Sequence, residues 1–467
     1  MENGLKPYEY YKYTQIIWAN RIPEHWDTKR AKALYNKATR SVREYDEVVT
    51  CFRDGTVTLR KKRRTTGFTE SIKEVGYQGI RKGDLVIHVM DAFAGAVGVS
   101  DSDGKGTPVY SVCIPKVKLN NNYFAYVVRE MAKTGFIQSL YRGIRERSSD
   151  FRFDVFAAQV LPVPPLEEQN QIVKYLDSQL LKINKFIKAK KKLIATLKEQ
   201  KQAVINQAVT KGIDPDVKMK PSGIEWLGTI PQHWSKEKIT RLFKVIGSGT
   251  TPKSGDLKYY DGDIQWINSG DLKDAHLYDT KRKVTKIALS DHSILKVYPK
   301  HTIVIAMYGA TIGKLAISRI DACCNQACCC LSEVNSNRIN LQYAFYLLYS
   351  CRNKLIEKSK GGGQPNISQD TIKSTWLPVP PVEEQERILS HIMEQIDRID
   401  KSLFIIEKEV SLILEYRTRL ISDVVTGKVD VRGLVVEDVN VDILDLEDTE
   451  LEELESEELA QLEESEV

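Results

Sequence analysis

The sequence predicts a mixed α/β protein in which two globular modules are carried by two long helices that form an antiparallel coiled coil. Two observations predict this fold class. The chain of 467 residues contains each of its main segments twice. In addition, each copy ends in a heptad-patterned stretch that is too long for an ordinary surface helix. A tandem repeat of this kind implies a pseudo-two-fold arrangement of one architecture.

The segments that flank each long helix recur at a constant spacing. LPVPPLEEQNQIV at 161–173 returns as LPVPPVEEQERIL at 377–389, and AVTKGID at 208–214 returns as VVTGKVD at 424–430. Both offsets are 216 residues (377 − 161 and 424 − 208). The two helices are therefore expected to have the same length.

A second repeat precedes each globular module. Residues 12–35 align with residues 220–243, pairing IPEHW with IPQHW and therefore His25 with His233. The offset here is 208 residues and rises to 216 at the long helices, so the second module is eight residues longer than the first. The recurrence of both histidines beside tryptophan predicts a structural hydrogen-bonding role for them.

Apolar residues in the long segments alternate at spacings of three and four, which predicts a coiled-coil seam in each. The seam of the first copy comprises Val173, Leu176, Leu180, Ile183, Ile187, Ile194, Leu197 and Val204. The seam of the second copy comprises Leu389, Ile392, Ile396, Ile399, Leu403, Ile406, Val410, Ile413 and Leu420. Two seams of matched length favour pairing with each other, and the alternative is that each seam pairs with another molecule.

Both helices have predictable ends. Pro165 and Pro381 stand just before glutamate pairs, and prolines and carboxylates suit the first turn of a helix. Gly212 and Gly427 follow the last seam residues and suit helix termination. These signals divide the chain into a first module with its leading segment (1–160), a helix (161–214), a second module with its leading segment (215–376), a helix (377–432) and a tail (433–467).

The composition, 42% hydrophobic and 28% charged, is that of an ordinary globular protein of two or three domains. No apolar run approaches the roughly 20 residues that span a bilayer. Five of the eight cysteines are clustered at 323–330 rather than spread as a disulfide framework. A reduced, cytoplasmic setting is therefore expected.

The net charge of +5 conceals a division between a basic body and an acidic tail. Residues 437–467 hold fifteen Asp and Glu and no Lys or Arg, so residues 1–436 carry +5 + 15 = +20. A basic body predicts a polyanionic partner, most simply nucleic acid. The tail is either a solvated extension or a segment that folds back on the basic surface.

The first module has strand-like runs at 47–52, 84–90 and 109–114, followed by a helical stretch near 122–134. It also contains two basic segments that are candidate phosphate contacts, with the alternative that they are solvated hairpin tips. The candidates are Arg60, Lys61, Lys62, Arg63, Arg64, Arg142, Arg145 and Arg147.

The second module begins with a Gly, Ser and Thr-rich stretch in which lysines and aromatic residues alternate. Two strands are expected around a glycine turn within 302–317, and a helix at 341–357 precedes a glycine-rich polar loop. Short polar side chains suit contacts with phosphates and base edges, and aromatic rings can support them. The candidates are Lys253, Lys258, Tyr259, Tyr260, Lys314, Gln364, Asn366 and Ser368.

No catalytic constellation is visible. The cysteines of CCNQACCC lack the paired knuckle spacing of a zinc site, and burial in a strand explains them better. GATIGKL at 309–315 fails the spacing of a phosphate-binding P-loop, and no G-x-G-x-x-G follows a strand. The chain is expected to bind no metal or nucleotide cofactor, and its residues indicate a binding and positioning protein.

The doubled LPVPP-x-EEQ and IP-x-HW motifs, together with AMYGATIGKLAI, NQACC and GGGQPNIS, resemble the specificity subunits of type I restriction-modification enzymes. The resemblance covers about residues 6–432. It is weaker in the first module, where RSSDFRFDVF at 147–156 stands in the place of GQPNISQDTI.

The resemblance implies that the modules are target-recognition domains, each reading half of a bipartite double-stranded DNA site, and that the coiled coil separates them. It also implies two methyltransferase subunits that use S-adenosylmethionine, and restriction and translocase subunits that use ATP and Mg²⁺. The alternative is a coiled-coil DNA-binding scaffold that has no methyltransferase partner.

Overall fold

The computed structural model describes residues 5–63, 75–140, 150–358 and 366–436, which divide into two compact units. Of these residues, unit 1 contains 5–191 and 408–436, and unit 2 contains 192–407. The boundary falls inside both long helices, α6 (Leu166–Lys211) and α11 (Val382–Val425). Each unit therefore combines one module with half of each long helix, in contrast to a division into consecutive segments.

The module of unit 1 contains short strands, helices and one 3-10 turn. In chain order they are β1 Tyr11–Tyr13, β2 Arg21–Pro23, β3 Asp27–Arg30, α1 Ala31–Leu34, β4 Tyr35–Lys37, β5 Val49–Cys51, β6 Val57–Leu59, α2 Arg60–Arg63, β7 Gln78–Ile80, β8 Leu85–His88, η1 Ala92–Ala94, β9 Val97–Val99, β10 Gly104–Gly106, β11 Tyr110–Pro115, α3 Asn121–Lys133, α4 Phe136–Ser139, α5 Phe153–Ala158 and β12 Val160–Val163.

The module of unit 2 follows the same plan with longer strands. In chain order its elements are β13 Met219–Ile224, β14 Leu227–Pro231, β15 Ser235–Lys238, α7 Ile239–Leu242, β16 Phe243–Ser248, η2 Leu257–Tyr259, β17 Tyr260–Ile267, η3 Ser269–Asp271, β18 Ala275–Leu277, β19 Arg282–Val284, α8 Lys286–Asp291, β20 Ile303–Ala306, β21 Leu315–Ser318, β22 Ala322–Cys324, β23 Cys328–Val334, α9 Leu341–Glu357, α10 Gln369–Ser374 and β24 Trp376–Val379.

The predicted mixed α/β tandem is confirmed, and the main sheets of the two units correspond. The main sheet of unit 1 has the strand order β4-β11-β8-β9, and that of unit 2 has β16-β23-β20-β21 with β18 added at the edge. Each hydrogen-bonded pair in the first order has its counterpart at the same place in the second, and all of these pairs are antiparallel. Helices α3 and α9 also correspond, because each begins at a capping asparagine, Asn120 or Asn340.

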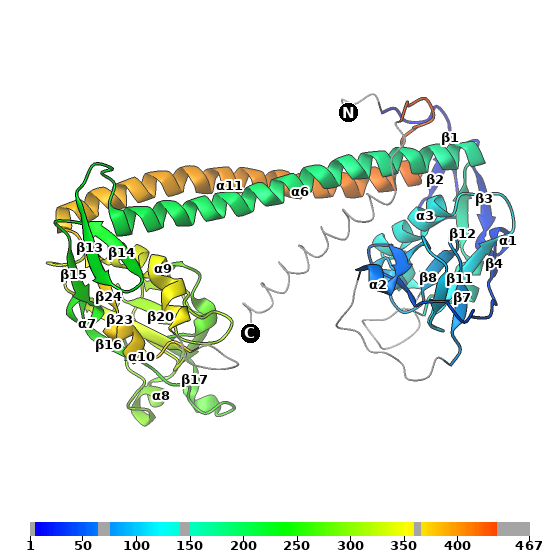
Figure 1. Ribbon diagram of the computed structural model, residues 1–467. Coiled ribbons are helices and arrows are strands. Elements are labelled where there is room, and N and C mark those ends of the chain that lie inside the picture. The colour runs from blue at the N-terminus through cyan, green and yellow to red at the C-terminus, as the bar shows by residue number, and fades with distance from the viewer. Residues whose placement is uncertain (1–4, 64–74, 141–149, 359–365, 437–467) are drawn as a thin grey trace. The chain divides into compact units, whose positions relative to one another are not determined.

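The two long helices pack together within each unit, as the matched seams predicted (Figure 1). In unit 1 the Lys190 Nζ lies 2.7 Å from the Glu409 Oε2, and Gln171 Nε2 donates to the carbonyl of Val431 in the segment that follows α11. In unit 2 the Lys201 Nζ lies 2.6 Å from the Asp400 Oδ1. Residue numbers rise along α6 as they fall along α11, so the pairing is antiparallel.

All of the predicted seam residues are buried or half-buried. The apolar contacts are denser near the modules than between them. The core of unit 1 includes α6 as far as Ile187 and α11 from Val410, and the core of unit 2 includes α6 from Ile205 and α11 as far as Ile392. Ile205 is buried although it lies beside the predicted seam position, because the module of unit 2 covers that face of α6.

The helices end at the predicted glycines. Gly427 has a φ of 74°, and the amides of Gly427 and Lys428 donate to the carbonyls of Val424 and Asp423. This is the Schellman arrangement, which satisfies carbonyls that the helix leaves unpaired. Gly212 has a φ of 79°, and its amide donates to the carbonyl of Ala208.

The repeated HW and EEQ motifs contact each other, which explains why both recur. In unit 1 the buried Glu168 carboxylate accepts hydrogen bonds from the Tyr8 hydroxyl (2.5 Å) and the Trp26 indole (2.9 Å), and it lies 2.7 Å from His25 Nε2. In unit 2 Glu384 lies 2.6 Å from His233 Nε2 and accepts from the Trp234 indole. The predicted structural role of both histidines is confirmed.

The glutamine of each EEQ motif fixes the start of the helix that follows the main sheet. Gln169 Oε1 accepts from the Asn120 amide, and Gln385 Oε1 accepts from the Asn340 amide. At the other end of the same junction, the hydroxyls of Tyr123 and Tyr343 donate to carbonyls in the last turns of α11 and α6. The motif therefore joins the start of one long helix to the module, and the module helix that it contacts is in turn bonded to the end of the other long helix.

All eight cysteines are buried and none forms a disulfide. Those of the 323–330 cluster lie on β22 and β23, as the strand interpretation predicted. Burial raises the pKa of the Cys323, Cys329 and Cys351 thiols to about 12. None of the described helices has the length and hydropathy of a membrane span.

Because the thiolate is the reactive form of cysteine, the native chain is expected to resist alkylation. With iodoacetamide at pH 8, mass spectrometry is expected to show no modified thiol in the folded chain and eight after denaturation. Rapid labelling of the 323–330 cluster in the folded chain would contradict its burial.

Candidate nucleic-acid interface

Four motifs of the second module meet at one end of its main sheet. The segment after the glycine-rich loop pairs with the end of β20, because Asn366 forms a β-bridge with Tyr308. The loop that follows β16 reaches the same place, where Thr251 Oγ1 lies 2.5 Å from Gln326 Oε1. We call these four residues the polar loop cluster.

The polar loop cluster presents hydrogen-bonding groups on short side chains. Gln326 and Asn366 are exposed, whereas Thr251 and Tyr308 are half-buried. Burial raises the pKa of Tyr308, and a side-chain hydrogen bond with Gln326 opposes that shift. The Tyr308 hydroxyl therefore keeps its proton at neutral pH. Amides and hydroxyls in this arrangement can both donate to and accept from base edges.

The candidate lysines of this module occupy different environments. Lys253 is exposed, directly after the loop that carries Thr251. Lys258 is also exposed and lies over the Tyr259 ring, with its ammonium 3.6 Å from an Asp291 oxygen. Lys314 is half-buried in the turn between β20 and β21.

Two candidate tyrosines and one candidate serine have their hydroxyls engaged within the module. Tyr259 is buried and donates to Asp291, and Tyr260 donates to the carbonyl of Pro252. Ser368 is the N-cap of α10, where its hydroxyl accepts from the Thr371 amide. These contacts favour roles in shaping the loops. Apart from the residue type, no sequence signal predicts that Ser368 caps α10.

The module of unit 1 has the same backbone arrangement with different side chains. The Phe151 amide donates to the carbonyl of Val89, as the Ile367 amide does to Met307. Asp150 therefore stands where Asn366 stands in unit 2, and Arg152 donates to it. The two modules present different chemistry on one backbone plan.

The basic run of the first module is engaged by its own acids. Lys61, Lys62 and Arg63 lie 2.5, 2.8 and 2.5 Å from carboxylate oxygens of Glu47, Asp101 and Asp54. The Arg63 side chain is only 10% exposed, and its guanidinium also lies 4.2 Å from the Phe52 ring centroid. Arg60 donates to Thr50. This geometry supports a structural role for α2 more than phosphate contact.

Five candidates lie outside the described residues, and they are Arg64, Arg142, Arg145, Arg147 and Gln364.

The sequence analysis did not identify some cations that lie beside aromatic rings because their strands are paired. Lys236 and Lys238 lie 5.5 and 5.4 Å from the Trp376 ring centroid, because β15 pairs with β24. In the same unit, Arg319 donates to His276. Burial and the Arg319 charge lower the pKa of His276, so it is neutral at pH 7. Only recognition of the strand pairing could have found these groups.

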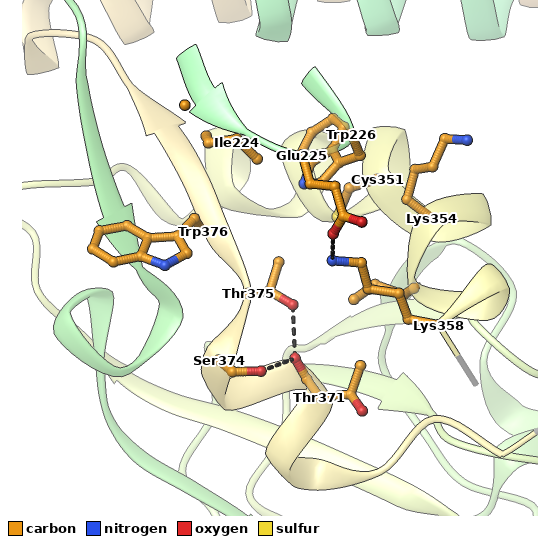
Figure 2. A pocket seen from close by; sticks show the side chains of 12 residues that line it. Ile224, Glu225, Trp226, Cys351, Lys354, Lys358, Thr371, Ser374, Thr375 and Trp376 are labelled. Carbon is orange, nitrogen blue, oxygen red and sulfur yellow. Dashed lines mark hydrogen bonds and ion pairs between the residues drawn. The ribbon is translucent and has the colours of Figure 1, made fainter. Parts of the chain in front are cut away.

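A cavity of about 240 Å³ lies beside Trp376, between the β13–β14 hairpin, the end of α9 and α10 (Figure 2). Trp226 and Trp376 contribute to its walls, and Lys358 at the rim pairs with Glu225 at 2.7 Å. The hydroxyls of Ser374 and Thr375 bond to the Thr371 carbonyl. The cavity is an aromatic and basic recess apart from the polar loop cluster.

The family model and the curated relatives that this chain matches all describe type I restriction enzyme specificity proteins. Residues 231–409 match a family described as the type I restriction modification DNA specificity domain. A putative type I restriction enzyme MjaX specificity subunit of Methanocaldococcus jannaschii is 23% identical over 445 residues, which are 91% of this chain and 97% of that protein. The EcoBI specificity subunit of Escherichia coli is 26% identical over 263 residues, 54% of each chain.

Solved structures share the fold. A structure reported for complex assembly and conformational transition of the type I R-M system aligns with a TM-score of 0.67 at 13% identity, over 86% of this chain and 98% of that chain. The HsdS subunit from Thermoanaerobacter tengcongensis aligns with a TM-score of 0.50 at 14% identity, over 87% and 98%.

Proposed function

We propose that this chain, whose residues 231–409 match the type I restriction modification DNA specificity domain, reads the two halves of a bipartite DNA site with its two modules. The observation that carries the proposal is the polar loop cluster, where four separate segments bring Thr251, Tyr308, Gln326 and Asn366 together. Specificity on DNA comes from such groups at base edges, and lysines such as Lys253 supply the phosphate contacts.

The difference between the modules supports two different half-sites. The position of Asn366 in unit 2 is taken by Asp150 in unit 1. An asparagine amide suits adenine, whereas an aspartate accepts hydrogen bonds from the cytosine amino group. Two modules with different groups on one backbone plan would read an asymmetric sequence.

We also propose which subunits this chain binds and where it acts. The chain is a non-catalytic, cytoplasmic subunit that positions two methyltransferase subunits on double-stranded DNA, and restriction and translocase subunits join that complex. S-adenosylmethionine, ATP and Mg²⁺ belong to those partners. This chain supplies sequence recognition and register, and the flipping and methylation of a base occur in a partner's pocket.

The test is to co-express the chain with a candidate methyltransferase subunit from the same genome and to map modified bases across the host genome. The expected result is a bipartite motif that is modified in each half and depends on this chain. If both proteins are soluble and associated but no chain-dependent motif appears, the protein is a DNA-binding scaffold instead. Gln326→Ala is expected to alter one half of the motif only.

DNA binding by the purified complex is expected to weaken steeply with salt. The logarithm of affinity should fall with the logarithm of salt concentration by about 0.9 per phosphate contact, because counterions are released from the duplex. Titration of a labelled duplex at several salt concentrations measures this slope. A slope near zero would argue against the DNA-reading function.

A further inference from the structure

A groove of about 500 Å³ in unit 1 lies between α3, η1 and the last turns of α11. The lining residues with charged side chains are Arg53, Arg129, Lys133, Arg417 and Glu130. The lining therefore carries four cations and one carboxylate, and Asp91 lies 2.9 Å from one of these cations, Arg53. The groove is apart from the polar loop cluster, which belongs to unit 2.

Arg129 is the cation that most requires a partner. Its guanidinium packs against the backbone of Gly55, so closely that a Cβ added there would stand 2.7 Å from the guanidinium carbon. Arg129 is half-buried, and it forms no hydrogen bond or ion pair with any residue that the structure describes. A partly desolvated guanidinium without a carboxylate is costly, and an anion in the groove would remove that cost.

The other lining groups can support such an anion. The Lys133 ammonium donates to the Thr418 carbonyl and lies 3.7 Å from one oxygen of Glu130. Arg53 lies 2.9 Å from Asp91, but its side chain remains 66% exposed. The Glu130 carboxylate opposes an incoming anion, although Lys133 and the Ser422 hydroxyl already partner it.

Unit 2 does not repeat this arrangement, although its elements correspond. Tyr349 of α9 occupies the place of Arg129, since both stand nine residues after the capping asparagine of their helix. Lys201 of α6 occupies the place of Arg417 at the 216-residue offset, and it is paired with Asp400 at 2.6 Å. The cationic groove is therefore a property of unit 1.

The chain has one other strongly asymmetric element, the acidic segment 437–467, which follows the second long helix and has no counterpart after the first. The described chain ends at Val436, which packs on the core of unit 1. Thirty-one residues can reach about 100 Å when extended, so the segment can reach any surface of its own unit.

We propose that residues 437–467 dock in the groove between α3 and α11, with carboxylates on Arg129 and Lys133. The fifteen acidic residues of this segment match a cationic site in the unit where it begins. A groove of this volume admits the side chains of a peptide, whereas a DNA duplex is too wide to enter it. The segment thereby neutralises the cationic side chains that line this groove of unit 1.

The test is zero-length carbodiimide crosslinking of the full chain at low salt, with the linked peptides identified by mass spectrometry. This reagent joins lysine amines to carboxylates, and Lys133 is the lysine that lines the groove. The expected result is a dominant link between Lys133 and residues 437–467. Lys61 is the matched control, because its side chain is 64% exposed in the same unit but lies outside the groove.

Arg129→Glu is expected to lower the yield of the Lys133 link by about ten-fold, because it replaces attraction by repulsion. Arg129→Lys should retain it. Thermal unfolding of each variant distinguishes lost docking from lost folding. Equal yields at Lys61 and Lys133, or an Arg129→Glu variant that is folded and still fully linked, would overturn the proposal. Loss of DNA affinity in Arg129→Glu without loss of the link would show a DNA contact instead, and would also overturn it.

Discussion

Glu168→Ala is expected to destabilise unit 1 by about 3–5 kcal/mol, the cost of breaking a buried network that contains a charge. The Glu168 carboxylate holds the Tyr8 hydroxyl, the His25 ring and the Trp26 indole at the start of α6. Its removal leaves the buried hydroxyl and indole without their acceptor. Urea unfolding, followed by tryptophan fluorescence, to which Trp18 and Trp26 of unit 1 contribute, measures the loss.

Glu167→Ala is the matched control for this substitution. Glu167 is the preceding residue of the same first helical turn, but it is exposed. Its removal is expected to cost no more than about 0.5 kcal/mol through the helix dipole. If the two substitutions have equal effects, the junction does not depend on the contacts described above. Glu384→Ala should act on unit 2 as Glu168→Ala acts on unit 1, since Glu384 binds His233 and Trp234.

Removal of one heptad from each long helix is expected to change the recognised DNA site. Deleting 191–197 and 402–408 removes facing stretches, because the Lys190–Glu409 and Lys201–Asp400 pairs bracket them. These stretches lie outside both cores, and seven residues preserve the seam register. The helices lose about 10.5 Å at 1.5 Å per residue, which corresponds to about three base pairs at 3.4 Å each.

Affinity for the original site is therefore expected to fall by about 100-fold or more, because one module can no longer meet its half-site. Affinity should return on a site whose spacer is shorter by about three base pairs. A variant of full length with Leu197→Ile and Ile406→Leu is the control, and it should keep the original spacer. If the shortened chain still prefers the original site, the helices do not set the spacing. In the cell, the genome-wide map of modified bases reports the spacer length of the recognised site.

The sequence was sufficient to predict the long helices, their pairing and the tandem modules. Heptad spacing, paired prolines and the glycines at 212 and 427 are local signals, and α6 and α11 begin and end near them. Because the repeated segments flank both modules, the sequence predicted that the second module has the same fold as the first. The expected helix at 341–357 is α9 with the same bounds.

Contacts that join distant segments could not be predicted residue by residue. The buried role of Glu168 depends on residues 143 and 160 positions away. Helix-dipole reasoning accounted for a glutamate in the first turn without predicting that it would be buried. The cations of α2 were conspicuous in the sequence, yet their partners are acids brought close by folding, such as Asp101 opposite Lys62. Lys236 and Trp376 do not stand out in the sequence, and their contact depends on the pairing of β15 with β24.

The way each unit is assembled also sets the order in which the protein can fold during its synthesis. Unit 2 is continuous from 192 to 407, whereas the core of unit 1 needs Val410, Leu420, Val424 and Val431 from the end of the chain. A ribosome adding about 5–20 residues per second takes roughly 10–40 s to translate the 216 residues (407 − 191) between them. During that interval the first module has emerged while the apolar side chains of the first half of α6 still have no helix to cover them. The module synthesised first is therefore the last to be completed, and the nascent chain is most exposed to aggregation and most dependent on chaperones over those seconds.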